Sequence, residues 1–209
     1  MVLFGVVILT NSITYSQINN KKHIASIDLQ NKHSIYIIAG FKTNSYTAAT
    51  VSPTTVKVET GFIGFIGYQY WFDNEWSFNL ITGLLNAESN VEYLDISSTR
   101  IIPVLIGFLY YPQALSLGTA GRVHFGINTG VYIGSASGVK SSLNNLKTGT
   151  VNETVWGIEP NMGIDFFVTD WLKIGPVISY HFISDFKEVI GNRKNYSGPV
   201  FAFNIGIVL

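Results

Sequence analysis

The segment that decides the fold is Arg122-Val-His-Phe-Gly-Ile-Asn-Thr-Gly-Val-Tyr-Ile-Gly134. Every second residue from Val123 to Ile133 is apolar except Thr129, and the residues between them are mostly glycine or polar. Successive side chains of a strand point to opposite faces, so this period of two predicts a strand with one apolar face. The segments 156–168, 172–182 and 201–209 repeat the pattern. We therefore expect an all-β chain.

Similar runs recur along the chain from position 34. They predict eight strands, at 34–43, 58–72, 76–87, 98–111, 122–135, 154–168, 172–183 and 198–209. The breaks at 73–75, 112–121 and 169–171 are mostly tighter than the breaks that alternate with them, at 44–57, 88–97, 136–153 and 184–197. Short turns at one end and long loops at the other are typical of an outer-membrane barrel, whose turns face the periplasm. A barrel of ten strands, with 23–29 in an extra element, remains an alternative.

Three prolines fall inside predicted strands, namely Pro103, Pro160 and Pro176. Because proline has no N–H for the strand ladder, we expect bulges or local bends at these positions.

The composition restricts what surrounds the protein. Only 12% of the residues are charged, about half the usual fraction of a soluble domain, so something other than water must face much of the surface. No apolar run approaches 18 residues, so a lipid-facing chain would have to cross with strands. The net charge is zero and cysteine is absent. We therefore expect no nucleic-acid partner, no disulfide and no acyl anchor.

Alternation alone does not say whether the apolar faces point inward or toward lipid. The opposite faces carry Gly, Asn, Ser and few ionisable groups, which suits a narrow lumen filled by side chains. Aromatic residues recur at both ends of the apolar faces and predict two girdles at the membrane interfaces: Phe62, Phe72, Trp76, Tyr110, Trp156, Phe166, Phe182 and Phe201. The ten residue-to-residue steps from Phe62 to Phe72 give about 33 Å of strand, or about 25 Å of height when the strand is tilted. We predict a transmembrane antiparallel up-and-down β-barrel of about eight strands.

The N-terminus begins with an apolar run at 2–9, followed by mostly polar residues and the small residue Ser16. This pattern predicts a Sec-type secretory signal peptide at 1–16. A periplasmic leader at 17–33 and an outer-membrane barrel domain at 34–209 would follow.

Several motifs carry a family resemblance: Gly67-Tyr68-Gln69-Tyr70-Trp71-Phe72 before Trp76-Ser77-Phe78, Ile101-Ile102-Pro103-Val104, Gly157-Ile158-Glu159-Pro160-Asn161-Met162-Gly163-Ile164-Asp165, and Trp171-Leu172-Lys173-Ile174-Gly175. With them the chain resembles the outer-membrane β-barrel domain of Bacteroidetes-type Gram-negative bacteria, a porin-family relative of the OmpA-type barrel. The resemblance implies outer-membrane lipid as surroundings and the barrel-assembly machinery as a partner. Members of the family often end in an aromatic residue, whereas this chain ends in Leu209 after Phe201 and Phe203.

The lumen faces carry the more informative ionisable residues. Residues that pair across two neighbouring strands point to the same face of the sheet. The face assignments therefore place Val168 opposite Leu172 and require a three-residue turn at 169–171. They predict a lumen ion network of Arg122, His124, Asp165, Lys173, Glu159 and His181, with Asp165 diagonal to Lys173 and Glu159 opposite His181. Charges inside a narrow barrel must be paired. We predict a plug of salt bridges, and the alternative is a gated proton or solute path.

No catalytic, cofactor-binding or metal site is expected. The four histidines are scattered along the chain. His181, Ser184 and Asp185 lie close in sequence. However, the alternation along the strand points Ser184 toward lipid and His181 into the lumen, so they are not expected to form a catalytic triad. We expect a non-enzymatic outer-membrane protein with a structural or surface-interaction role and an unspecified extracellular partner. The alternatives are a porin-like passive transporter of small solutes and a soluble lipocalin-like binder of an apolar ligand.

Overall fold

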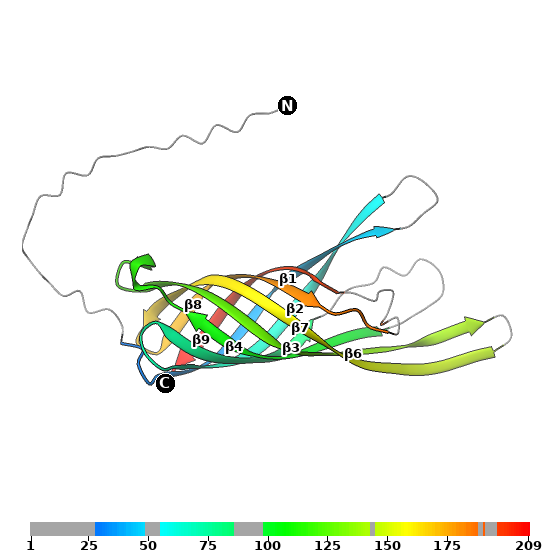
Figure 1. Cartoon of the computed structure of the whole chain (residues 1–209), viewed down its shortest axis with the longest axis horizontal. Coiled ribbons are helices and arrows are strands. Elements are labelled where there is room, and N and C mark those ends of the chain that lie inside the picture. Colours follow the sequence, from blue (N-terminus) through cyan, green and yellow to red (C-terminus); the bar gives the residue numbers. More distant parts are fainter. Residues whose placement is uncertain (1–27, 49–54, 86–97, 143–144, 188–189, 191–195) are drawn as a thin grey trace, which may run out of the picture.

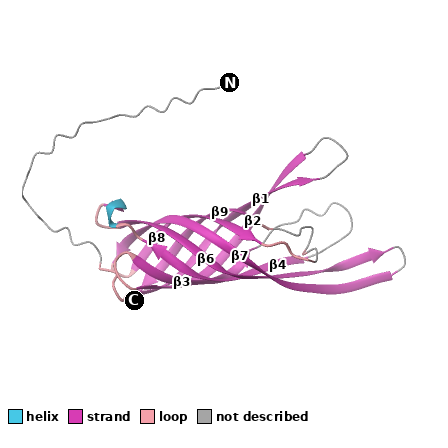
Figure 2. Ribbon diagram, viewed as in Figure 1, coloured by secondary structure: helices cyan, strands magenta, loops and turns pink. Residues whose placement is uncertain are grey.

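The computed structural model describes residues 28–48, 55–85, 98–142, 145–187, 190 and 196–209. Within these residues, eight long antiparallel strands form a closed barrel (Figures 1 and 2). The strands are β1 (His33–Ala48), β2 (Thr55–Trp71), β3 (Trp76–Leu85), β4 (Ser98–Tyr110), β6 (Gly121–Ser142), β7 (Asn145–Thr169), β8 (Leu172–Ile183) and β9 (Gly198–Val208). Each long strand pairs with its neighbours in sequence, and the pairing of β1 with β9 closes the circle. The predicted fold class is confirmed, and the ten-stranded alternative is wrong.

The turn between β4 and β6 contains the remaining elements. A short 3-10 helix, η1 (Gln113–Leu115), is followed by the two-residue strand β5 (Ser116–Leu117), which pairs with the start of β6. The described part of the chain has no helix that is long and apolar enough to cross a membrane.

The β6–β7 hairpin is longer than the sequence predicted. We expected a loop at 136–153, but the ladder continues from Gly121↔Phe166 to Ser142↔Asn145. The β1–β2 ladder likewise extends to Ala48↔Thr55. Figure 1 shows both hairpins extending beyond one end of the barrel, away from the C-terminus. These segments are rich in Ser, Thr, Asn and Lys, so their composition resembled that of a loop although their backbones pair as strands.

The apolar faces point outward, as the alternation predicted. Along β9, Phe203 and Ile205 are 66% and 59% exposed, whereas Asn204 between them is only 3% exposed. Large apolar side chains are exposed in the same alternating way on every long strand. So much contiguous apolar surface exceeds what monomeric soluble proteins leave in water. A soluble lipocalin-like barrel would bury this face, so that alternative is wrong.

The strand prolines do not produce the expected bulges. Pro103 pairs with Tyr132, and Pro176 pairs with Phe203, in ladders whose register does not change. On the other side of Pro103, the β3–β4 ladder skips the proline and resumes in the same register. Pro160 behaves in the same way between β6 and β8. One interrupted ladder is therefore enough to accommodate a residue that lacks an N–H.

The irregularity lies instead at the turn between β7 and β8. The pairing shifts between Phe167 and Thr169, and Thr169 rather than Val168 stands opposite Leu172. The Thr169 hydroxyl accepts a hydrogen bond from the Leu172 N–H at 3.1 Å, which favours the tighter turn. The predicted three-residue turn is wrong, because counting alternation does not reveal a bulge. The register further along, with Phe166 opposite Ile174, is the one expected.

Candidate functional site

A polar cluster fills the lumen near the turn end, with Asp165 of β7 at its centre. Its carboxylate lies 3.1 Å from Lys173 Nζ and 3.8 Å from His124 Nδ1. The Tyr111 hydroxyl and the Asn204 side-chain amide donate to the two carboxylate oxygens at 2.8 and 2.9 Å. All five side chains are buried. Strands on opposite sides of the barrel therefore meet at one carboxylate.

Lys173 has further partners that explain how an ammonium group is tolerated here. It donates to Gln69 Oε1 at 2.6 Å, and Gln69 in turn donates to the Tyr111 hydroxyl at 2.8 Å. Its Nζ also lies about 5 Å from the ring centroids of Tyr36 and Trp71, within cation–π range. A buried ion pair needs such additional bonds to offset its desolvation.

The other predicted lumen residues are also buried, but two of them have different partners. Glu159 accepts hydrogen bonds from Asn128, at 2.9 Å, and from the Ser179 hydroxyl. His181 Nδ1 lies 2.8 Å from the Tyr132 hydroxyl. The β7–β8 ladder skips Glu159 and His181, although the register on either side puts them opposite each other, and each bonds to a neutral neighbour. The ion pairs of Asp165 with Lys173 and His124 therefore lie at the turn end of the lumen.

Arg122 lies at the turn end of the lumen. It stands opposite Asp165 in the β6–β7 ladder and is only 4% exposed. Together with Asn74, Gln113 and Ser116 it lines a cavity of about 190 Å³.

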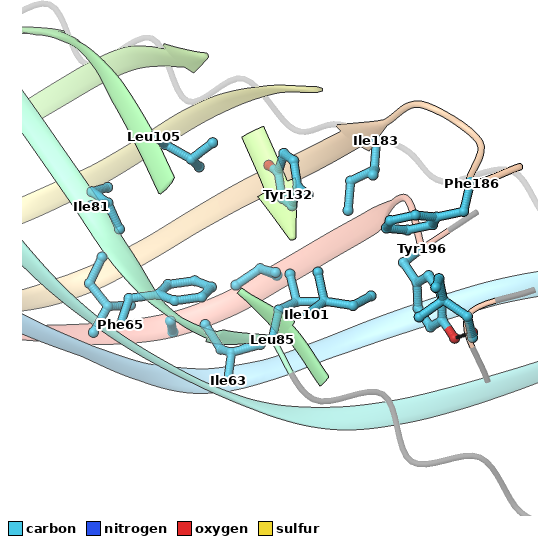
Figure 3. Close-up of a cluster of buried hydrophobic side chains, with 14 of the residues drawn as sticks. Ile63, Phe65, Ile81, Leu85, Ile101, Leu105, Tyr132, Ile183, Phe186 and Tyr196 are labelled. Atoms are coloured by element: carbon cyan, nitrogen blue, oxygen red, sulfur yellow. Dashed lines mark hydrogen bonds between the residues drawn. The ribbon is translucent and has the colours of Figure 1, made fainter. Parts of the chain in front are cut away.

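The loop half of the lumen is lined mostly by apolar side chains, and Lys42 and His181 are also buried there. Figure 3 shows side chains from several strands meeting there, with Phe186 and Tyr196 of the β8–β9 connection packed against them. Ile190 is fully buried in the same cluster, and the Tyr196 hydroxyl donates to the Ile190 carbonyl. The cluster comprises Tyr36, Ile38, Ile63, Phe65, Ile81, Leu85, Ile101, Leu105, Tyr132, Ala136, Ile183, Phe186, Ile190, Tyr196, Val200 and Ala202. The barrel is therefore packed at its loop end as well.

The described end of the N-terminal leader packs against the turn end. Leu29 is fully buried in a second apolar cluster with Leu109, Tyr111, Phe167, Trp71 and Val208. Its N–H donates to Asn74 Oδ1 at 2.7 Å. Asn31 has a φ of 60°, a left-handed conformation that asparagine tolerates well, and its N–H bonds to the Trp71 carbonyl at 2.9 Å.

The predicted girdle residues lie on the outer surface. Seven of them are between 40% and 55% exposed, and Tyr110 is partly exposed with its ring 4.7 Å from that of Trp76. Phe62 and Phe201 flank Phe41 in the β2–β1–β9 ladders, so three phenylalanines share one height near the loop end.

The structure does not bring together a catalytic triad at the outer end of β8. His181 is fully buried and faces the lumen, whereas Ser184 and Asp185 are exposed.

The sequence reasoning missed Gln69, Tyr111, Asn204 and Tyr36. All but Tyr111 lie on lumen-facing positions of strands, so parity could have marked them as interior residues. Nothing local indicated that they meet Asp165 or Lys173, since Gln69 and Lys173 are 104 positions apart.

No protein-family model and no curated protein matches this sequence. Solved structures do match. Neisserial surface protein A has a TM-score of 0.52 at 12% identity, covering 85% of this chain and 96% of its own. The outer membrane protein OprG of Pseudomonas aeruginosa has a TM-score of 0.51 at 14% identity, with coverages of 86% and 97%. Ail, the attachment invasion locus protein of Yersinia pestis, in complex with sucrose octasulfate, has a TM-score of 0.50 at 14% identity, with coverages of 86% and 99%. At these identities the likeness shows the fold, the closed eight-stranded antiparallel β-barrel that the OmpA-type pattern implied.

Proposed function

We propose that this chain is an outer-membrane protein of a Gram-negative bacterium of Bacteroidetes type, with a structural or surface-interaction role and a lumen closed to solutes. The observation that carries the proposal is the packing of the lumen, polar around Asp165 and apolar around Phe186 and Tyr196. An eight-stranded barrel is just wide enough for its own side chains to fill. The outward apolar face would lie in outer-membrane lipid, between the two aromatic girdles.

Two protruding hairpins support the surface-interaction part of the proposal. The β6–β7 ladder continues beyond the last β4 pair, Ser98↔Ser137, and beyond the last β8 pair, Gly157↔Ile183. Among the described residues, the outer part of each hairpin strand therefore pairs only with its hairpin partner. In outer-membrane barrels the long connections face the outside of the cell. The segment 1–16 would be the signal peptide, and the barrel-assembly machinery would insert the strands.

Single-cysteine labelling tests this orientation, because the chain contains no cysteine. Asn152 is exposed on the β6–β7 hairpin and Asp170 is exposed in the β7–β8 turn. We expect a membrane-impermeant maleimide to label Asn152→Cys in intact cells. Asp170→Cys should react only after the outer membrane is permeabilised. Labelling of Asp170→Cys alone in intact cells would reverse the orientation, and labelling of neither variant after permeabilisation would argue against exposed hairpins and turns.

Planar-bilayer recording tests the closed lumen. We expect the refolded protein to give no steady conductance, because both halves of the lumen are packed by side chains. A large porin inserted into the same bilayer serves as the positive control. A steady conductance from this chain would instead assign it to passive transport of small solutes, the second candidate function.

A further inference from the structure

A small cavity lies in the lumen between the Asp165 cluster and Glu159. Its volume is about 30 Å³, and its polar lining includes Asn79, His124, Glu159, Asn161, Asp165 and Asn204. A cavity needs roughly 10 to 15 Å³ on this measure to hold one water molecule. The space therefore suits about two waters and is too small for an organic solute.

Four polar atoms around this cavity have no hydrogen-bond partner among the described residues: Asn79 Oδ1, His124 Nδ1, Asn161 Nδ2 and Asn204 Oδ1. Three of the four belong to side chains that are at most 3% exposed, and Asn161 is partly buried. Buried polar groups in folded proteins are almost always bonded to protein or to ordered water. Four such atoms around one cavity therefore point to an occupant.

The chemistry of the lining selects the occupant. An anion would meet the carboxyl groups of Glu159 and Asp165, and a cation would meet the ammonium group of Lys173 and the amide N–H groups of Asn161. An apolar molecule would satisfy none of the four atoms. Water both donates and accepts, and a buried water typically makes about three hydrogen bonds.

We propose that this cavity is a site for ordered water, which joins the Asp165 cluster to Glu159 in one hydrogen-bonded network. The network runs from Gln69 and Lys173, through the water, to Asn128. It ends below the mainly apolar cluster of the loop half. The packed side chains of this cluster close the outer end of the lumen, so internal water does not make the barrel a pore. This site goes beyond the proposed surface role and does not depend on it.

Nuclear magnetic resonance of the full chain, refolded in lipid nanodiscs, tests the site. We expect cross-relaxation between water and the side-chain amide protons of Asn161. The variant Val177→Ile adds one methylene to the cavity wall. It should remove this signal and lower the urea midpoint, because the polar atoms lose their partner. The matched control is Val200→Ile, which adds the same methylene within the apolar cluster and should leave the signal in place.

A dry cavity gives the opposite result. The wild-type signal would be absent, and Val177→Ile would keep or raise the urea midpoint, since filling a dry cavity adds packing contacts. That outcome would overturn the proposal. If Val177→Ile fails to refold, the wild-type spectrum decides by itself: the water signal at Asn161 supports the site, and its absence refutes it.

Discussion

Replacing Asp165 with alanine is expected to lower the free energy of unfolding by about 3 to 5 kcal/mol, the usual cost of breaking a buried ion pair. In the wild type, Lys173 Nζ lies 3.1 Å from Asp165 Oδ2. The substitution removes this carboxylate and leaves the ammonium group buried without a counter-charge. The Tyr111 hydroxyl and the Asn204 amide lose their acceptor at the same time. Urea titrations in lipid vesicles, followed by tryptophan fluorescence, measure the effect.

Two further variants separate charge from shape. Asp165→Asn keeps the size of the side chain and one acceptor oxygen, so a large loss in this variant would come mainly from the uncompensated ammonium. Combining Asp165→Ala with Lys173→Met should recover part of the loss, because the unpaired charge has gone. A double-mutant cycle reports the coupling between the two residues. Additive losses would contradict the ion pair as the source of the stability.

The fold was largely predictable because a barrel in lipid imposes one rule on every strand. In β9, alternate residues from Phe201 to Ile207 face outward and are apolar, and Asn204 between them faces the lumen. The same period fixed the bounds of β8, Leu172–Ile183, without error. Since a shift of one residue would move every apolar side chain to the lumen, the pattern specifies the register strongly.

The exceptions occur where this rule does not apply. Beyond the barrel wall, both faces of the β6–β7 hairpin can be polar, so the period of two disappears while the pairing continues to Ser142↔Asn145. At the β7–β8 turn, the extra residue between Phe167 and Thr169 occurs together with a hydrogen bond from the Leu172 N–H to the Thr169 hydroxyl. Alternation carries no information on either feature.

The candidate site was predictable only in part. Asp165 and Lys173 lie on neighbouring strands joined by a short turn, so parity and register place them on one diagonal. The contacts of Lys173 with Gln69 and Tyr36 cross the lumen. Such contacts depend on the diameter and shear of the closed barrel, which a single strand does not encode. The inward packing of Phe186 and Tyr196 is likewise a tertiary outcome without a periodic signal.

Replacing Ile178 with arginine is expected to destabilise the membrane-inserted barrel by about 2 to 4 kcal/mol, the cost of a charge near the middle of the lipid-facing surface. Ile178 is 46% exposed and lies in β8 between the turn-end residue Leu172 and the loop-end girdle residue Phe182. Its side chain contacts no lumen group that could pair with a guanidinium, because it points outward. Urea titrations in lipid vesicles measure the loss, and Ile164→Arg on the neighbouring face of β7 should behave similarly.

The matched control changes depth and keeps the chemistry. Val168 is 57% exposed on the same outer surface, two residues beyond the girdle residue Phe166 and next to the β7–β8 turn. There an arginine can extend its guanidinium into the interfacial region, so Val168→Arg should cost only about 0 to 1 kcal/mol. A soluble protein would show little effect in either variant, since both positions would already face water. Equal and small losses of stability for Ile178→Arg and Val168→Arg would therefore argue against lipid on the outer face of the barrel. A much larger loss for Ile178→Arg than for Val168→Arg would support it.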